Sequence, residues 1–423
     1  MKVAILGYGI EGKAAETYFQ AKKHQTQVFS DFKEADIPNF KLENFDLVLR
    51  SPSVHPQYVL KPENRGNSTN WQTSTEYFFK HCSAPIIGVT GTKGKGTTSS
   101  LIANILKSTG QTVHLVGNIG IPALSILDKI EKDDVVVYEL SSFQLWDMQT
   151  SPHIAVVLRI ETDHLDHHPS LEDYVAAKAN ITKHQTPNDY CIYYRNNSES
   201  SKIANLSLGT ILAYPSNSHR PQLEKILDHL KLMGAHNREN AEAAILATAA
   251  FLGQSLEQLF KNSNLISQIQ TGLSGFQGLP HRVQFIRNLN HVDYYDDNYS
   301  SAFPSLDVAL KAFLDRPLVL IAGGKDKNHG LNAAEIRQRI FSTPNLKKAI
   351  LIGENKYSLA KNIDSNLYQF ANTLEEAILS ARNLAEQYQN SIVLMSPAAA
   401  SFDMFKNFKD RGEQFQKIVN KLK

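Results

Sequence analysis

"GVTGTKGKGTTSS", residues 88–100, carries the clearest indication of how this chain folds. The apolar run at residues 85–87 predicts a strand before it, and an amphipathic stretch ending at Gly110 predicts a helix after it. Strand, glycine-rich loop and helix in this order are typical of a loop that binds phosphates in an α/β domain. The alternative is a glycine-rich turn with a lysine at the surface, and the order of the elements favours the phosphate loop.

The residues of this loop fit a nucleoside triphosphate. Gly91 and Gly94 let backbone N–H groups surround a phosphate chain, and Lys95 adds a positive charge suited to the β- and γ-phosphates. A hydroxyl residue usually follows that lysine and binds Mg²⁺, but here Gly96 takes its place. We expect Thr97, the next residue, to supply the hydroxyl through a turn shifted by one position.

The composition is that of an ordinary globular protein. The chain has 423 residues, of which 42% are hydrophobic and 20% charged, so it is long enough for two or three domains. A net charge of +2 argues against broad nucleic-acid binding, and two cysteines indicate neither a disulfide framework nor a cysteine metal cluster. The sequence has no signal-peptide pattern and no run of about 18 apolar residues. We therefore expect a cytoplasmic protein without membrane insertion or nucleic-acid binding.

The alternation of strand and helix patterns recurs along the chain. Short apolar runs that predict buried strands occur in "KVAILGYG", "FDLVLRSP", "DDVVVYEL", "IAVVLRIE", "RPLVLIAGG", "KKAILIGE" and "SIVLMSPA". Such runs, separated by helical stretches and short turns, imply parallel, doubly wound sheets. The simplest interpretation is three α/β domains, at residues 1–84, 85–278 and 279–423.

The first strand ends in "GYGIEG", which places three glycines in G-x-G-x-x-G register. Gly7, Gly9 and Gly12 let the backbone approach a diphosphate at the N-terminus of the following helix, where free N–H groups favour an anion. Asp31 lies 19 residues beyond Gly12 and is suited to accept hydrogen bonds from a ribose or a base. A nicotinamide dehydrogenase is one alternative, but no nicotinamide-specific catalytic set follows, so we predict a site for a nucleotide diphosphate.

Two further strands of the middle segment end in polar residues that could hold Mg²⁺. Glu139 ends one strand beside Ser141, a suitable position for a hard oxygen ligand. His164 lies near the end of another strand, flanked by Asp163 and Asp166. A solvated strand-end charge and a structural histidine are the alternatives. Because ligands of parallel sheets bind at the carboxyl ends of the strands, we expect these residues close to the phosphate loop.

"TGTKGKGTT" resembles the ATP loop of the Mur ligases and folylpolyglutamate synthases, whose shared pattern is T-G-T-x-G-K followed by small hydroxyl residues. Glycine after the lysine is closer to the folylpolyglutamate branch. The rest of the chain, nearly end to end, resembles the Mur ligases that add D-glutamate to UDP-N-acetylmuramoyl-L-alanine. The motifs that carry this resemblance are, in order, "GNIGIPAL", "ELSSFQL", "TDHLDHH", "YVAAKANI", "GAHNRENAEAA", "GLPHR" and "SPAAASFDMFKNFKDRG".

The resemblance implies a fold and an activity. The expected fold is an N-terminal Rossmann-like domain for the UDP substrate, a central P-loop ATPase-like domain, and a C-terminal Rossmann-like domain for the amino acid. The expected activity is ATP-dependent amide ligation in peptidoglycan precursor synthesis, through an acyl phosphate, with UDP-N-acetylmuramoyl-L-alanine and glutamate as substrates. A monomer with two Mg²⁺ ions and a carbamylated lysine, Lys178, is implied as well.

The loop and the resemblance together give a set of expected site residues. For ATP these are Gly91, Thr92, Lys93, Gly94, Lys95, Gly96, Thr97, Asn240, Arg282 and Asp297. For catalysis they are Lys95, His164 and Lys178, and for the metal Thr97, Glu139, His164 and Lys178. For the UDP substrate they are Gly9, Ile10, Glu11, Gly12, Asp31, Asn118 and Ser141. For the amino acid they are Ser301, Lys327, Ser401 and Phe408.

The chain departs from the pattern of the family in the stretch "DDNYSSA", residues 296–302. Tyr299 stands where a lysine is usual, which removes a positive charge near the ATP phosphates and the amino-acid pocket. Lys325, on a neighbouring loop, is a candidate to restore it, and Ser301 keeps a hydroxyl in place of threonine. Ser53 replaces a usual glycine on the nucleotide-sugar side. The same chemistry with L-glutamate or another amino acid is therefore an open alternative.

Several of these residues have plainer interpretations. From the sequence alone, Lys178 reads as a surface lysine, Asn237 and Asn240 as helix caps, and "KNFKDRG" as a basic, solvated helix face. A folylpolyglutamate synthase or a non-catalytic nucleotide-binding protein would also explain the loop. Neither would explain "GYGIEG" together with Lys95, Glu139, His164 and Lys178.

Overall fold

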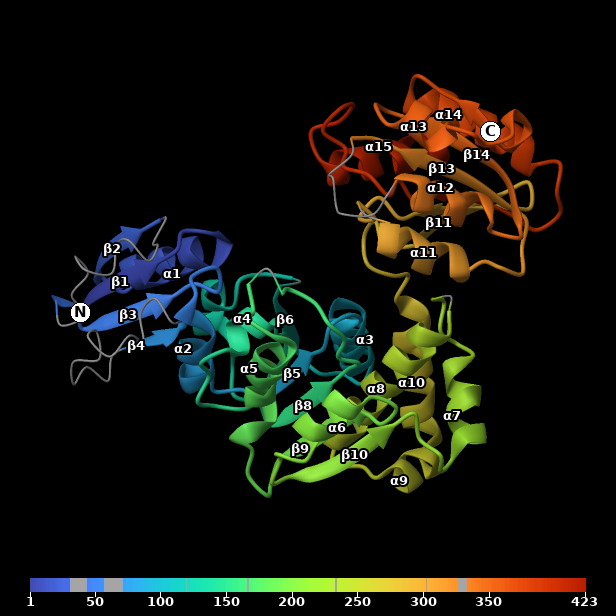
Figure 1. Ribbon diagram of the computed structural model, residues 1–423. Coiled ribbons are helices and arrows are strands. Elements are labelled where there is room, and N and C mark those ends of the chain that lie inside the picture. Colours follow the sequence, from blue (N-terminus) through green and yellow to red (C-terminus); the bar gives the residue numbers. More distant parts are fainter. Residues whose placement is uncertain are drawn as a thin grey trace. The chain divides into compact units, whose positions relative to one another are not determined.

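The computed structural model describes residues 1–30, 44–56, 71–118, 120–165, 167–232, 234–301, 303–325 and 333–423. Two compact units make up the chain (Figure 1). The first comprises Met1–Leu230 with His236–Phe276, and the second comprises Lys231–Ala235 with Gln277–Lys423. The first unit contains two parallel sheets and the second contains one mixed sheet. Asp31 and Lys327, both predicted site residues, lie outside the described residues, as does Asp166.

The N-terminal sheet has four parallel strands in the order β2-β1-β3-β4. Its central strand carries apolar residues on both faces, as expected of a parallel strand covered on both sides. One face packs against the first helix through Phe19. The elements are β1 (Lys2–Leu6), α1 (Ile10–Ala21), β2 (Gln25–Phe29), β3 (Leu47–Arg50), β4 (Trp71–Thr73) and α2 (Ser74–His81).

The central sheet has six parallel strands in the order β10-β9-β8-β5-β7-β6. Strand β5 lies between β7 and β8, so the loops after these three strands open at the same edge of the sheet. The strands are β5 (Ile86–Thr90), β6 (Val113–Gly117), β7 (Val135–Glu139), β8 (Ile154–Val157), β9 (Tyr190–Tyr194) and β10 (Thr210–Tyr214). The helices are α3 (Lys95–Ser108), α4 (Ser142–Leu145), α5 (Leu171–Lys183), α6 (Ser198–Ala204), α7 (Arg220–Leu227), α8 (Ala235–Phe251), α9 (Leu256–Lys261) and α10 (Ser263–Gly275), with short 3₁₀ turns η5 (Ala123–Ser125) and η6 (Leu127–Lys129).

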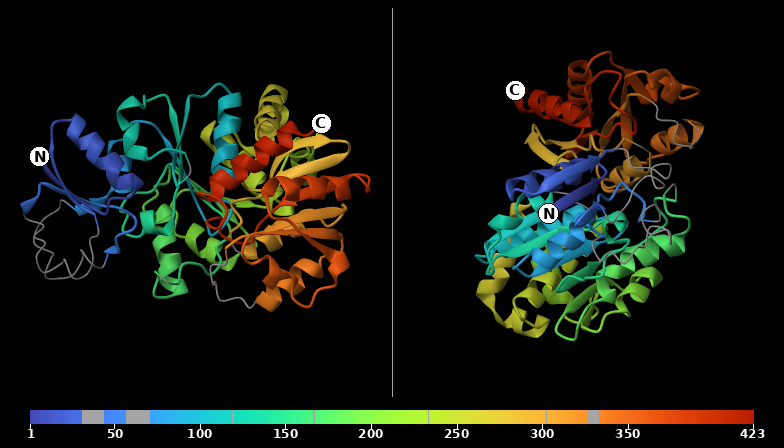
Figure 2. Two further views of the ribbon diagram at one scale, coloured as in Figure 1. Left: turned by 90° about the horizontal axis from the view of Figure 1, so that it is seen from above. Right: turned by 90° about the vertical axis from the view of Figure 1, so that its left-hand side faces the viewer.

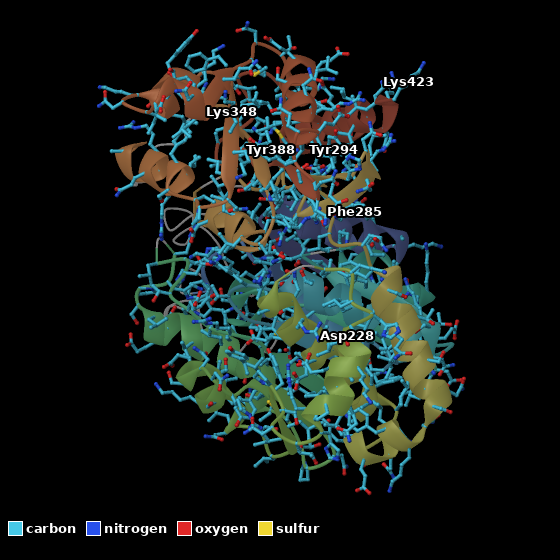
Figure 3. The ribbon with its side chains drawn as sticks, turned by 90° about the vertical axis from the view of Figure 1, so that its right-hand side faces the viewer. Asp228, Phe285, Tyr294, Lys348, Tyr388 and Lys423 are labelled. Carbon is cyan, nitrogen blue, oxygen red and sulfur yellow. The ribbon has the colours of Figure 1, made fainter. Side chains whose placement is uncertain are left out.

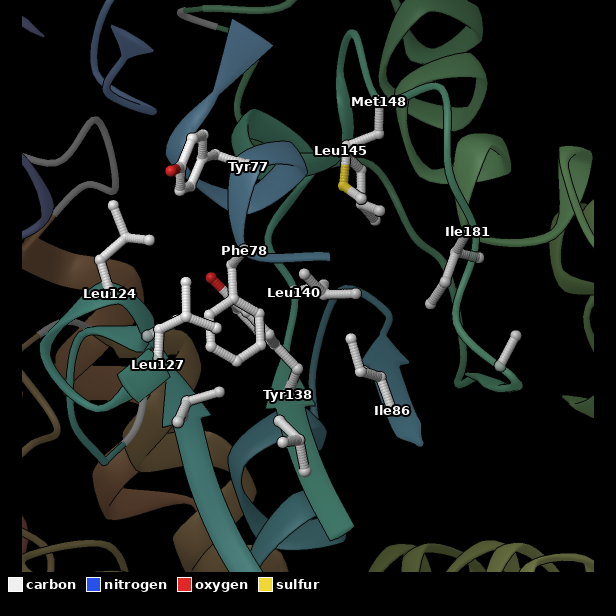
Figure 4. Packing of buried hydrophobic residues seen from close by; sticks show 14 of the residues in the cluster. Tyr77, Phe78, Ile86, Leu124, Leu127, Tyr138, Leu140, Leu145, Met148 and Ile181 are labelled. Carbon is white, nitrogen blue, oxygen red and sulfur yellow. The ribbon is translucent and has the colours of Figure 1, made fainter. Parts of the chain in front are cut away.

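One hydrophobic core joins the two sheets of the first unit. It runs from Val3 and Phe19, at the N-terminal sheet, to Ile181 of α5. Figure 4 shows the middle of this core, where Phe78 of α2 packs edge-to-face on Tyr138 of β7, with ring centroids 5.6 Å apart. Continuous burial of this kind explains why the first two sheets form a single compact unit.

The C-terminal sheet has six strands in the order β11-β12-β16-β13-β14-β15. Strands β11 and β12 form an antiparallel pair, and the other neighbours are parallel. The strands are β11 (Gln284–Leu289), β12 (Val292–Asp296), β13 (Leu318–Gly323), β14 (Leu346–Ile352), β15 (Tyr368–Phe370) and β16 (Ser391–Met395). The helices are α11 (Phe303–Lys311), α12 (Ala333–Phe341), α13 (Lys356–Ala360), α14 (Leu374–Ala385) and α15 (Phe408–Lys421), with the 3₁₀ turn η7 (Ser365–Leu367).

The two faces of the C-terminal sheet have separate cores. Helices α14 and α15 cover the face that carries Tyr294, and helices α11, α12 and α13 cover the face on which Phe285 packs. Figure 2 shows helices on both sides of this sheet, and Figure 3 shows its side chains, with Tyr294 and Phe285 labelled. This three-layer arrangement is the one expected when strands alternate with amphipathic helices.

The structure confirms the α/β prediction of parallel, Rossmann-like sheets. Each of the three sheets falls within one of the three predicted domain segments, while the boundaries at residues 84 and 278 stay predictions. The antiparallel β11–β12 pair was not expected from the sequence. Among the described residues, no helix is both long and apolar enough to cross a membrane.

Candidate active site

The phosphate loop joins β5 to α3 and is shaped by two glycines. Gly91 has φ +154°, and a Cβ there would lie 2.6 Å from Cβ of Leu158. Gly94 has φ +86° and caps α3, which begins at Lys95. An L-residue would be strained at either position, so the loop requires glycine at both. The N-terminus of α3 therefore begins directly at this loop, as an anion site at a helix N-terminus requires.

The other loop residues divide between structural and accessible positions. Thr92 is buried, and its hydroxyl bonds the backbone of Glu161, donating to the carbonyl at 3.0 Å and accepting from the N–H at 2.8 Å. Gly96 is buried, Lys93 is exposed and Thr97 is half-buried in the first turn of α3. The Lys95 ammonium folds back and donates to the carbonyl oxygens of Gly91 and Thr92, at 3.0 Å each.

Lys178, on α5, is not the surface lysine that the plain interpretation of the sequence suggested. Its side chain is 1% exposed and its Nζ atom donates to the Gly91 carbonyl at 3.1 Å. Thr90 Oγ1 lies 3.3 Å from the same nitrogen, and the ring centroid of Tyr174 lies 4.7 Å away. The amine therefore lies directly beneath the phosphate loop.

The surroundings of Lys178 oppose its positive charge. Burial, and next the nearby Lys95 ammonium, lower the pKa of Lys178 well below its usual value, although Asp163 and Glu139 pull in the opposite direction. A buried amine in this position favours the neutral form, which has a free lone pair.

Glu139 and His164 reach the same edge of the central sheet. Glu139 is the last residue of β7, the neighbour of β5, and is 7% exposed. His164 follows β8 with φ +55°, and its half-exposed ring lies 3.7 Å from Asp163 through Nε2 and contacts Phe143 at 5.1 Å between centroids. Among the described residues, no three His, Cys, Asp or Glu side chains converge as a metal cluster.

Asn237 and Asn240 lie inside α8, which begins at Ala235, so neither is the cap of this helix. Asn240 donates to Asn237 Oδ1 at 3.3 Å. Its own Oδ1 atom would lie 2.6 Å from a Cβ at Gly94. The asparagine side chain thus packs against the phosphate loop. Position 94 therefore has no room for a side chain, in addition to requiring a positive φ.

Close contacts fix the conformation of the glycine loop after β1. Gly7 has φ +85° and donates to Phe29 O at 2.8 Å, while a Cβ at Gly12 would lie 2.2 Å from Gly7 O. Gly9 has open space around it, and the neighbouring Ile10 is 76% exposed. Gly7 and Gly12 are therefore needed for the turn, whereas Gly9 and Ile10 form its open side.

Glu11, Gln144 and Ser141 connect the N-terminal and central sheets. Gln144 Nε2 donates to Glu11 Oε1 at 2.6 Å, and Ser141 caps α4 through a reciprocal capping box with Gln144. Among the described residues, Glu11 Oε2 is buried without a hydrogen-bond partner, and burial raises the pKa of Glu11 to about 7. Glu11 and Ser141 thus both form side-chain hydrogen bonds with Gln144. Asn118, by contrast, is exposed.

Arg282 and Asp297, the residues of the second unit predicted for ATP, lie near each other. Asp297 accepts from Ser396 Oγ at 2.6 Å and from Val283 N at 3.1 Å, and burial raises the pKa of Asp297 to about 7. The Arg282 guanidinium lies over the Tyr299 ring, 3.8 Å from its centroid.

Three of the residues predicted for the amino acid are described in the same unit: Ser301 and Ser401 lie in loops, and Phe408 is the first residue of α15. Phe408 contacts the Tyr299 ring edge-to-face at 5.3 Å, and Ser301 follows two positions later. Ser401 is buried, next to Ala400, whose backbone pairs with that of Lys325 through two 2.9 Å hydrogen bonds. The exposed Lys325 is thereby placed beside the Ser401 loop.

Comparison with known proteins decides the family. Residues 89–248 match the Mur ligase middle domain. UDP-N-acetylmuramoylalanine–D-glutamate ligase of Clostridium tetani (strain Massachusetts / E88) is 32% identical over 463 aligned positions, covering 100% of this chain and 97% of that protein. The chain belongs to the Mur ligase family. A Clostridium kluyveri protein of the same name is 34% identical, covering 90% of this chain and 84% of its own. The crystal structure of UDP-N-acetylmuramate–alanine ligase of Thermotoga maritima, at 17% identity, shares the fold with a TM-score of 0.58 over 99% of both chains.

One buried histidine of this Mur ligase was not predicted from the sequence. His168 is fully buried between Asp173 Oδ2, 2.7 Å from Nδ1, and Ser142 Oγ, 3.0 Å from Nε2. Its backbone N–H donates to His164 O at 2.8 Å, so it fixes the turn that carries His164. The repeated histidines of "DHLDHH" were the available signal, but the chain gives no hint of which one is buried.

The role of Arg411 within "KNFKDRG" was not predicted from the sequence either. The guanidinium is fully buried, donates to Asn298 Oδ1 at 2.7 Å and Ala399 O at 3.2 Å, and thereby ties the two loops of the second unit. Burial lowers the pKa of Arg411 to about 10. The interpretation of this stretch as a solvated basic face is therefore wrong at its arginine.

Proposed function

We propose that this Mur ligase joins D-glutamate to UDP-N-acetylmuramoyl-L-alanine at the expense of ATP, in the synthesis of peptidoglycan precursors. Full-length relatives at 32% and 34% identity bear that name, which supports this substrate over a folate substrate. The observation that carries the proposal is the meeting of Lys95 and Lys178 at the Gly91 carbonyl, beneath a loop shaped for phosphates. Monomeric state, cytoplasmic location and the boundaries at residues 84 and 278 are parts of the proposal that rest on sequence.

The nucleotide site consists of the phosphate loop and residues around it. Backbone N–H groups of the loop surround the phosphates, and the Lys95 ammonium turns from its loop carbonyls toward the β- and γ-phosphates. Asn240, packed against Gly94, serves the adenine side, and we assign Arg282 and Asp297 to the same nucleotide.

Two Mg²⁺ ions are part of the proposal, and the donor set fits them. Mg²⁺ in phosphoryl-transfer sites takes one or two carboxylates together with phosphate oxygens, so the lack of a three-residue cluster among the described residues is compatible with it. Glu139, Thr97, His164 and a carbamylated Lys178 would hold the ions. Bound Mg²⁺ neutralises charge that develops on the phosphates.

The buried position of Lys178 supports its carbamylation. A neutral, buried amine attacks CO₂ through its lone pair and loses a proton, giving an anionic carbamate. This change replaces a cation beside Lys95 with an anion that Lys95 attracts. The site thus gains the negative charge that a metal needs.

The reaction proceeds by two displacements. An oxygen of the alanyl carboxylate attacks the γ-phosphorus, the bond to the β-phosphate oxygen breaks, and ADP leaves. The neutral amine of glutamate then attacks the acyl carbon, and phosphate leaves as the amide forms and the amine loses a proton. Lys95 stabilises charge on the transferred phosphoryl group. His164, which follows the neighbouring strand β8, helps to stabilise the same charge.

The remaining residues bind the two other substrates in this proposal. Gly9, Ile10, Glu11, Gly12, Asp31, Asn118 and Ser141 are assigned to the UDP substrate, with Glu11 and Ser141 acting by shaping the site rather than through free side chains. Ser301, Lys327, Ser401 and Phe408 are assigned to glutamate, with Lys325 as an additional cation beside Ser401.

Phosphate release tests the proposal directly. Purified protein with ATP, Mg²⁺ and UDP-N-acetylmuramoyl-L-alanine is expected to release phosphate with D-glutamate and much more slowly with L-glutamate or other amino acids. Release with L-glutamate alone would correct the amino acid, and no release with any amino acid would refute the ligase assignment.

A further inference from the structure

Arg282 lies between two residues whose backbone conformation is strained. His281 has φ +61° and Val283 has φ +46°, values that residues other than glycine rarely adopt. Val283 N donates to Asp297 Oδ1 at 3.1 Å, and Tyr299 N donates to His281 O at 2.9 Å. Such strain persists only where surrounding contacts enforce it, and it is common where a side chain must be presented in one direction.

The side chain presented in this way stacks on an aromatic ring. The Arg282 Cζ atom lies 3.8 Å from the centroid of Tyr299, and the Tyr299 ring in turn meets Phe408 edge-to-face at 5.3 Å and 84°. Phe408 packs against the Tyr299 ring, and Tyr299 remains 47% exposed. Tyr299 is therefore a platform that has the guanidinium over its face and the Phe408 ring packed against it.

The stacked guanidinium keeps its hydrogen-bonding capacity. Within the part of the chain that the structure describes, the Arg282 guanidinium forms no hydrogen bond or ion pair, and the residue is exposed. Stacking uses the face of the guanidinium and leaves the N–H donors in its plane available as a fork for an oxyanion. A phosphate chain is the oxyanion with the highest charge among the proposed substrates, and arginine binds phosphate in a bidentate manner.

We infer that Tyr299 is a positioning residue that holds the Arg282 guanidinium flat so that its N–H donors bind the phosphates of the nucleotide. This inference rests on the proposed function, and it gives the aromatic residue at position 299 a role of its own. The platform acts only through Arg282, so its effect disappears when the arginine is absent.

Steady-state kinetics of the full chain test this role. Tyr299→Leu is expected to raise the KM for ATP about two- to five-fold, the value of one partly exposed cation–π contact, with the KM for D-glutamate little changed. Tyr299→Phe keeps the ring and is expected to restore the KM for ATP to nearly that of the wild type. Arg282→Gln removes the charged fork and is expected to raise the KM for ATP about tenfold or more.

A double-variant cycle separates positioning from general damage. In the Arg282→Gln background, Tyr299→Leu is expected to cause no further increase in the KM for ATP. Equal effects of Tyr299→Leu in both backgrounds, failure of Tyr299→Phe to rescue, or a rise in the KM for glutamate instead would overturn the inference.

Nucleotide binding without turnover keeps the test independent of the ligase assignment. Calorimetric titration with a nonhydrolysable ATP analogue and Mg²⁺ is expected to give the same order of affinities, wild type and Tyr299→Phe above Tyr299→Leu, and Arg282→Gln weakest. If the four proteins bind the analogue in that order but the wild type ligates no amino acid, the proposed substrates are refuted and the positioning role stands. Equal affinities of Tyr299→Leu and Tyr299→Phe for the analogue would refute the positioning role without affecting the proposed substrates.

Discussion

Lys95 and Lys178 donate hydrogen bonds to the same oxygen atom, the carbonyl of Gly91, at 3.0 and 3.1 Å. Lys95 reaches it from the first turn of α3, and Lys178 reaches it from α5. Two ammonium groups at one carbonyl repel each other strongly where one of them is buried. The arrangement is therefore most favourable when Lys178 is neutral or carries a negative charge, which leads to the first two predictions.

Carbamylation of Lys178 is expected to be visible without an activity assay. Protein equilibrated with ¹³C-labelled bicarbonate should show a carbamate carbon signal in its NMR spectrum, because the buried neutral amine captures CO₂. Lys178→Ala is expected to lack the signal and to lose most ligase activity, which formate or acetate partly restores. Lys183→Ala, an exposed lysine on the same helix, is the control and should keep both. A carbamate signal that survives in Lys178→Ala would contradict the assignment.

The charge state of Lys178 also predicts how stability depends on pH. Its folded-state pKa is lowered, so between that value and the ordinary pKa of a lysine the unfolded chain binds more protons than the folded protein. The contribution of Lys178 to the free energy of unfolding therefore increases as pH rises toward about 10 and decreases as pH falls. Lys178→Met has no such group, so the stability difference, wild type minus variant, is expected to rise between pH 7 and 10.

Tryptophan fluorescence measures this difference in the relevant unit. Both tryptophans of the chain, Trp71 and Trp146, lie in the first unit, so urea unfolding followed by their emission reports on that unit. The experiment uses buffers free of CO₂, so that the wild-type amine is not carbamylated. A stability difference independent of pH would show that Lys178 is charged in the folded protein.

Thr97 is expected to supply the hydroxyl that Gly96 lacks. Thr97→Val removes this hydroxyl at nearly constant volume and is expected to raise the Mg²⁺ concentration needed for half-maximal activity by about tenfold, because one oxygen ligand is lost. The measurement is phosphate release as a function of Mg²⁺ at saturating ATP. An unchanged Mg²⁺ dependence would exclude Thr97 as a ligand.

The next residue of the same helix provides a matched control. Thr98 is fully buried, and its Oγ1 atom has no hydrogen-bond partner among the described residues. Thr98→Val therefore removes an unsatisfied buried hydroxyl, which is expected to leave the Mg²⁺ dependence unchanged and stability equal or higher. An equal effect of both variants on Mg²⁺ would mean that disturbance of α3, and not ligand loss, is responsible.

The sequence predicted those parts of the structure that depend on local pattern. Buried parallel strands are continuous apolar runs, so the local sequence pattern predicted β5, β7, β8 and β13. Strand order then places Glu139 beside the phosphate loop. Gly91 and Gly94 were likewise recognisable, because their backbone conformations exclude other residues.

Depth and distant partners could not be predicted in this way. Lys178 has the sequence context of a surface lysine, and only the packing of α5 against β5 shows that it is buried. The partner of Arg411 is Asn298, 113 residues earlier in the chain. Glu11 was predicted to bind the UDP substrate, and nothing in the local sequence indicated that its carboxylate accepts a hydrogen bond from Gln144, 133 residues away.

Glu11 gives a prediction with the opposite sign to that of Lys178. Its pKa is raised to about 7 by burial, so between its ordinary value and pH 7 the folded protein binds more protons than the unfolded chain. Its stabilising contribution is present at low pH and is lost as pH rises through 7. Glu11→Gln mimics the protonated form and keeps an acceptor for Gln144. The variant is therefore expected to match the wild type at pH 5 and to exceed its free energy of unfolding by on the order of 2 kcal/mol at pH 8.

Tryptophan-monitored urea unfolding at the two pH values measures this effect in the first unit. Glu131→Gln removes an exposed carboxylate from the same unit and controls for the change in net charge. A Glu11→Gln variant that is less stable than the wild type at pH 8 would mean that the carboxylate is ionised and well solvated in the folded protein. In that case Glu11 would face the substrate side, as the sequence first suggested, and its hydrogen bond to Gln144 would not persist in solution.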